Sequence, residues 1–224
     1  MPSLDNLLAE SSLDAFQVLV APGRSNSGAH HWQTFLEAAL IDAQRVIQAD
    51  WNRPRLGPWA RRVAESVARS EKPVLVVAHS FGCLATVAAG GTLAAPIAGA
   101  LLVAPADPGR FGIDQASIDK RLPFPSTLVL SRNDPWLDLE VGRALGARWG
   151  SRIVDAGMAG HINVDSGHGV WPLAAALLKD LAAAVGALPA VIRPLRDADP
   201  FSWQTAPPLS RARSGTRRAS HRRG

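Results

Sequence analysis

The sequence predicts a single α/β domain, in which a mostly parallel β-sheet is covered by helices on both faces. Several short runs are apolar throughout, which is typical of strands buried on both faces of a sheet. These runs alternate along the chain with segments of helical spacing, the order expected of a parallel sheet with crossover helices. The length of 224 residues and the hydrophobic content of 47% suit one globular domain with a sizeable core.

The strands are expected where apolar residues form short runs bounded by glycine, proline or charged residues. In chain order they cover residues 16–21, 45–49, 73–78, 97–104, 127–131 and 152–155. The helices are expected where apolar side chains recur every three or four residues. They cover residues 30–41, 59–69, 81–89, 136–149 and 171–185.

The charge of the chain separates its domain from its tail. Residues 1–14 read as a lead-in, 15–188 as the folded domain, and 189–224 as a tail rich in Pro, Ser and Arg that we expect to be disordered. The tail has eight arginines and two aspartates, so of the net charge of +5 the remaining residues carry −1. A nucleic-acid surface across the domain is therefore not expected, and binding to nucleic acid or an acidic surface is expected only through the tail.

Cysteine content and apolar runs bear on the compartment. Cys83 is the single cysteine, which excludes an intramolecular disulfide and suits a cytoplasmic location; we expect it to be a small core residue. The longest apolar run, residues 93–106, is broken by two prolines and is too short to span a membrane. The acidic start of the chain lacks the cationic region of a secretory signal.

The strongest strand signal runs directly into the sequence His-Ser-Phe-Gly at residues 79–82, which a helix rich in small residues follows. A strand, a serine in a tight turn and a helix are the context of a nucleophile elbow, in which the serine hydroxyl is lifted above the sheet. Small residues are needed two positions before and after the serine; these are Ala78, where glycine is usual, and Gly82. The alternative is that Ser80 simply caps the helix.

A nucleophilic serine needs a base and an orienting acid, which on this fold follow it in the order acid, then histidine. Asp134 lies in the loop that follows the strand 127–131, at the sheet edge where catalytic groups gather, although it also suits an Asx turn. Asp138 is expected on the next helix, pointing elsewhere. His161 lies in the loop after the last strand, with His168 as its rival.

A metal site is the disfavoured alternative for this last loop. His161, Asp165 and His168 are metal-ligating residue types, but they lack the spacing of a recognised zinc motif. We therefore expect no metal and no organic cofactor.

Two backbone N–H groups are expected to form an oxyanion hole. One belongs to Phe81, directly after the serine, and the other to Arg24, in the glycine-containing loop after the first strand. The alternative is that this loop is a plain turn whose Asn26 or Ser27 caps the following helix.

Five sequence blocks resemble one known family. They are PG-x-x-NSG-x-x-HW at 22–32, DW-x-x-P at 50–54, VAHS-x-G at 77–82, SRNDP at 131–135 and AGHIN at 159–163. In order and spacing they are similar to the small serine hydrolases related to retinoblastoma-binding protein 9, within the α/β-hydrolase superfamily. The resemblance covers about residues 15–187 and implies an α/β-hydrolase-like fold with Ser80, Asp134 and His161 as a catalytic triad. The block SGHGVWP at 166–172 departs from the family at His168 and Val170, which places His168 further from catalysis.

The expected function is hydrolysis of carboxylic esters or amides through an acyl-enzyme. Only about 20 residues separate the strand after the serine helix from the next strand, too few for a helical lid, so small or exposed acyl substrates are expected at an open site. Phe111, Phe124 and Trp136 are candidates to line it. The alternative function is a non-catalytic protein-binding module on the same fold.

Overall fold

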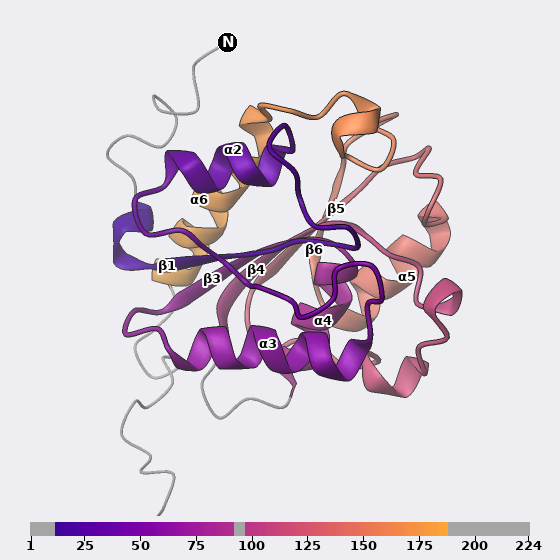
Figure 1. Cartoon of the computed structure of the whole chain (residues 1–224), viewed down its shortest axis with the longest axis horizontal. Helices are drawn as coiled ribbons and strands as arrows, with labels where there is room; N and C mark the ends of the chain where they lie inside the picture. Colours follow the sequence, from indigo (N-terminus) through magenta and orange to yellow (C-terminus); the bar gives the residue numbers. More distant parts are fainter. Residues whose placement is uncertain (1–11, 92–96, 188–224) are drawn as a thin grey trace, which may run out of the picture. The chain divides into compact units, whose positions relative to one another are not determined.

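The computed structural model describes residues 12–91 and 97–187, and its strands form one six-stranded, fully parallel sheet (Figure 1). The strands are Gln17–Ala21 (β1), Gln44–Arg45 (β2), Val74–Ser80 (β3), Ile97–Pro105 (β4), Ser126–Leu130 (β5) and Arg152–Asp155 (β6). Their order across the sheet is β2-β1-β3-β4-β5-β6. The predicted parallel α/β sheet is confirmed.

Helices cover both faces of this sheet. The α-helices are Trp32–Ala39 (α2), Leu56–Ala68 (α3), Phe81–Gly90 (α4), Leu139–Trp149 (α5) and Pro172–Gly186 (α6), and short 3-10 turns are Ser12–Ala15 (η1), Gly109–Phe111 (η2), Gln115–Ser117 (η3) and Val164–Ser166 (η4). In Figure 1, α3 and α4 lie on the opposite face from α2 and α6. Alternate residues of β3 point into the two cores. Val76 belongs to the core cluster that contains residues of α3, α4 and α5, and Val77 belongs to the cluster that contains residues of α2 and α6.

Three element boundaries differ from the prediction by three residues or more. Helix α5 begins at Leu139 rather than at residue 136, because the Asp138 side chain accepts hydrogen bonds from the N–H groups of Glu140 and Val141 and so caps the helix there. Helix α3 begins at Leu56, three residues early, since a proline is tolerated in a first helical turn. Strand β2 pairs over two residues only.

The side on which successive strands are added to the sheet reverses at β1. Strand β1 lies between β2 and β3, and the helices that follow β1 and β3 pack on opposite faces. The loops after these two strands therefore diverge at the carboxyl edge of the sheet, the position at which open α/β sheets bind their ligands.

No helical lid is inserted between β4 and β5. Residues 106–125 lie within the described range and contain η2 and η3 but no α-helix. Within the described residues no helix is long and apolar enough to cross a membrane. The expected tail, 189–224, and most of the lead-in lie outside the described residues.

Candidate active site

Ser80 occupies the turn between β3 and α4. Its backbone has φ 53° and ψ −123°, a conformation that residues other than glycine rarely adopt. The pairing of β3 with β4 shifts register between His79 and Ser80, so the serine leaves the regular ladder. Although Ser80 stands at the cap position of α4, its side chain makes no capping hydrogen bond, and the interpretation of its hydroxyl as a simple helix cap is wrong.

The small residues around the serine have distinct causes. A Cβ atom added to Gly82 would lie 2.1 Å from the carbonyl oxygen of Ala21 and 2.6 Å from that of Pro22, because the end of β1 passes directly over the start of α4. Any side chain there would displace backbone. Ala78 pairs with Ala21 across the sheet and is fully buried, and its methyl group is accommodated.

The structure brings Ser80, His161 and Asp134 into one hydrogen-bonded chain. His161 Nε2 lies 3.0 Å from Ser80 Oγ, and His161 Nδ1 lies 2.9 Å from each carboxylate oxygen of Asp134. The side chains of His161 and Asp134 are 9% and 3% exposed, so water screens their contact poorly. A neutral imidazole that donates its Nδ1 proton to the carboxylate keeps the Nε2 lone pair free for the serine hydroxyl.

The Asp134 carboxylate has a second partner that orients it. Its Oδ1 also accepts a hydrogen bond of 2.9 Å from the backbone N–H of Trp136. The residue thus forms the Asx turn that the sequence allowed and faces the histidine at the same time.

The rival residues point elsewhere. His168 Nδ1 pairs with Ser166 Oγ at 3.2 Å, its ring stands edge-on to Trp171, and burial lowers its pKa. Within residues 12–91 and 97–187, no three His, Cys, Asp or Glu side chains gather as metal ligands would. Cys83 is buried, its Sγ hydrogen faces the carbonyl of Val103, and burial raises the pKa of its thiol, so it is a core residue.

The loop after β1 lies against the serine. A Cβ atom on Gly23 would lie 2.6 Å from Ser80 Cβ and 3.1 Å from its Oγ. Arg24 follows directly, and its backbone N–H donates none of the described hydrogen bonds. Phe81, the first residue of α4, carries an N–H group that has no partner earlier in its own helix. Both predicted oxyanion donors are thus on segments that adjoin Ser80.

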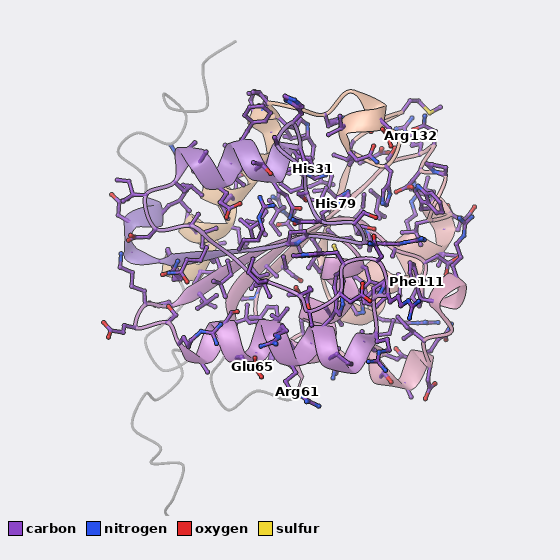
Figure 2. All side chains as sticks on the ribbon, in the orientation of Figure 1. His31, Arg61, Glu65, His79, Phe111 and Arg132 are labelled. Atoms are coloured by element: carbon purple, nitrogen blue, oxygen red, sulfur yellow. The ribbon has the colours of Figure 1, made fainter. Side chains whose placement is uncertain are left out.

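The cap of α2 is His31, so the alternative in which Asn26 or Ser27 caps this helix is wrong. His31 Nδ1 accepts the N–H of Gln33 at 3.2 Å, while the Ser27 hydroxyl binds the Gln33 side chain. Burial, with a smaller contribution from the Arg45 cation, lowers the pKa of His31 to about 4. Figure 2 shows His31 next to His79, and their ring centroids are 4.9 Å apart.

The three candidate aromatic residues differ in position. Trp136 is half exposed, with its ring centroid 6.4 Å from that of His161, and the Arg110 guanidinium lies over the Trp136 ring at 5.5 Å. Phe111, labelled in Figure 2, packs edge-on against Phe81. Phe124 is a core residue against Gly90 and does not line the site.

Four side chains that hold the loop between β6 and α6, which carries His161, are not predicted in the sequence analysis. Asn133 Oδ1 accepts the N–H of Gly160 at 2.8 Å, and Ser131 Oγ accepts that of Ala159 at 3.0 Å. On the other side, Trp32 and His79 contact the loop through their ring N–H groups. All four residues belong to the sequence blocks that resemble the family, and this membership is the only sign of their role that the sequence offers.

Comparison with known proteins identifies the family of the chain. A family model for serine hydrolases matches residues 18–180, and no curated protein sequence matches the chain significantly. The chain is 31% identical to the structure of a putative YdeN-like hydrolase from Pectobacterium atrosepticum, with a TM-score of 0.76 over 81% of this chain and 98% of that one.

More distant structures share the fold. The ydeN gene product of B. subtilis is 20% identical, with a TM-score of 0.64 over 75% of this chain and 98% of that one. Est1E of Butyrivibrio proteoclasticus, solved with ferulic acid, is 12% identical, with a TM-score of 0.60 over 76% and 89%. The predicted α/β-hydrolase-like fold and the resemblance to small serine hydrolases are thereby confirmed, and the chain belongs to the serine hydrolase family.

Proposed function

We propose that this hydrolase cleaves carboxylic ester or amide bonds through a covalent acyl-enzyme formed on Ser80. The observation that carries the proposal is the chain of contacts from Ser80 Oγ through the His161 ring to Asp134, at 3.0 and 2.9 Å. A strained serine within reach of an imidazole that a buried carboxylate orients is the arrangement that nucleophilic acyl transfer needs.

The reaction follows from the roles of these three side chains. Ser80 Oγ attacks the substrate carbonyl carbon while His161 Nε2 takes its proton, which gives a tetrahedral intermediate and an imidazolium that Asp134 stabilises. The same Nε2 then protonates the departing alcohol or amine as its bond to carbon breaks. Water attacks the resulting ester of Ser80 by the same route, which releases the acid and restores the serine hydroxyl.

Two backbone N–H groups are proposed to bind the developing oxyanion. Phe81 N–H starts α4, where the helix dipole also favours negative charge. Arg24 N–H follows Gly23, which contacts Ser80, and makes no other described hydrogen bond. Each such donor is worth about 3 kcal/mol in the transition state.

The absence of an α-helix from residues 106–125 favours small or exposed acyl substrates. The half-exposed ring of Trp136, beside His161, offers an apolar surface for one side of the scissile bond. A cytoplasmic location and nucleic-acid binding by the tail remain predictions from the sequence alone.

A panel of nitrophenyl esters of increasing acyl length, together with aminoacyl nitroanilides, tests the proposal on the full chain. Ser80→Ala should retain less than about 1% of the wild-type rate, because loss of a nucleophile costs several orders of magnitude. Ser117→Ala, at an exposed serine of η3, is the control and should retain full activity. A protein-binding module without catalysis would show no turnover that depends on Ser80.

A further inference from the structure

Two buried side chains outside the proposed triad hold the loop that carries His161. The indole N–H of Trp32, the first residue of α2, donates to the carbonyl of Ile162 at 2.8 Å. The imidazole Nε2 of His79, in β3, lies 2.9 Å from the carbonyl oxygen of His161. Since a carbonyl can only accept, His79 must carry its proton on Nε2. The two donors come from separate segments of the chain and converge on consecutive carbonyl groups.

The residue between these contacts has an unusual backbone. Ile162 has φ 49°, although β-branched residues are among the least suited to positive φ. Such a conformation persists only where its surroundings over-determine it. The carbonyls of His161 and Ile162 belong to the two peptide groups that flank the Ile162 Cα atom. The two donors therefore fix both peptide planes on which the φ and ψ of this residue depend.

The two contacts from Trp32 and His79 to the carbonyls of Ile162 and His161, here called the clamp, lie in the core and carry no charge. Trp32 and Ile162 are almost fully buried and belong to the same core cluster. Burial, above all, holds the pKa of His79 well below its ordinary value. His79 thus stays neutral beside His31 and His161, whose rings are each 4.9 Å away. A neutral donor holds the loop without adding a positive charge next to the catalytic base.

We propose that Trp32 and His79 are positioning residues that hold the His161–Ile162 backbone so that the His161 ring reaches Ser80 and Asp134 together. This inference rests on the proposed function. The His161 side chain is attached next to one of the clamped peptide groups. If either carbonyl loses its donor, the His161 ring can move away from both Ser80 and Asp134. A displacement of about 1 Å at a reacting group costs about a hundredfold in rate.

Trp32→Phe is the decisive variant, because it removes the indole N–H and keeps a six-membered aromatic ring at the same position. Trp149→Phe is a matched control: Trp149 is also 1% exposed, and its indole N–H donates to the Ile118 carbonyl at 2.9 Å, in contact with the opposite face of the sheet. Both variants leave one buried carbonyl without its donor. We expect Trp32→Phe to lower kcat at least tenfold with KM within twofold. Both variants should lower the melting temperature by similar amounts, and Trp149→Phe should leave kcat unchanged.

His79 is tested by a pair of substitutions. His79→Leu removes the donor, whereas His79→Gln keeps an N–H donor on a flexible side chain and should recover part of the lost kcat. Equal kcat values for Trp32→Phe and Trp149→Phe, or a His79→Leu enzyme with wild-type kcat, would overturn the inference.

Failure of the clamp can be told apart from failure of the proposed function. A wild-type chain without hydrolytic activity refutes the proposed function. Amide hydrogen exchange over residues 159–168 tests the clamp whether or not the enzyme turns over substrate. Exchange there should accelerate in Trp32→Phe and not in Trp149→Phe, and an unchanged exchange rate in Trp32→Phe contradicts the clamp.

Discussion

Substitution of Gly23 by alanine should damage the proposed active site through a single methyl group. The added Cβ would lie 2.6 Å from Ser80 Cβ, 3.1 Å from Ser80 Oγ and 3.2 Å from the carbonyl oxygen of His79. Ordinary contact begins at 3.4 Å. The first of these pairs must therefore separate by about 0.8 Å, which is close to the displacement of about 1 Å that costs a hundredfold in rate.

The expected loss in kcat is about a hundredfold, equivalent to about 2.7 kcal/mol in the activation barrier. Overpacking by one methyl group costs about 1–3 kcal/mol in folding free energy, which for a chain of this size lowers the melting temperature by about 2–12 °C. Ester hydrolysis and thermal unfolding of the same preparation measure both effects.

Gly28→Ala is the control in the same loop, since no atom lies within 4 Å of its added Cβ. This variant should keep wild-type kcat and stability. A Gly23→Ala enzyme with wild-type kcat would refute the close packing of this loop on the nucleophile. An equal loss in Gly28→Ala would show that flexibility of the loop, rather than the clash, is what matters.

The remaining predictions concern the base, pH and the tail. His161→Ala should be nearly inactive and His168→Ala mildly affected in the same ester assay; the reverse result would show that the wrong histidine is assigned as base. Hydrolysis should rise with pH, because only a neutral imidazole can accept the serine proton, and a rate that does not depend on pH contradicts a histidine base. The folded chain keeps His31 neutral down to a pKa of about 4, against an ordinary 6.5, so the unfolded chain binds more protons between these values. Stability should thus fall as pH drops below 6.5, with His31 contributing about 2 kcal/mol of loss at pH 5; urea unfolding should show a smaller loss for His31→Asn, which keeps a capping acceptor, and equal losses would contradict this. Truncation after Leu188 should leave turnover unchanged and shift the melting temperature by less than about 4 °C; a larger drop would mean that the tail packs on the domain.

Much of the fold follows from local sequence patterns. Runs such as residues 74–78 are apolar throughout, and burial on both faces leaves a parallel strand little other choice. The start of α5 differs from the prediction because its capping residue, Asp138, is the third residue of a continuous helical pattern. The start of α2 was misjudged because a histidine is an uncommon cap, and only the fold shows that His31 turns its Nδ1 toward the helix.

The candidate site divides in the same way. Ser80, Asp134 and His161 are recognisable because each follows a predicted strand, and the carboxyl ends of parallel strands meet at one edge. The supports of the histidine loop are not recognisable by such reasoning. Trp32 fits the apolar face of a helix, and its bond to a carbonyl 130 residues away depends on tertiary packing. The positive φ of Ile162 likewise has no signal in the residue type, which disfavours it.

Covalent labelling tests the central claim most directly. The full chain is treated with a fluorophosphonate, which phosphonylates an activated serine, and the modified peptide is identified by mass spectrometry. The account predicts one adduct per chain, on the peptide containing Ser80, that is lost in Ser80→Ala and formed much more slowly in His161→Ala. An unmodified wild-type chain, or an adduct that persists in Ser80→Ala, would contradict the assignment of Ser80 as the nucleophile.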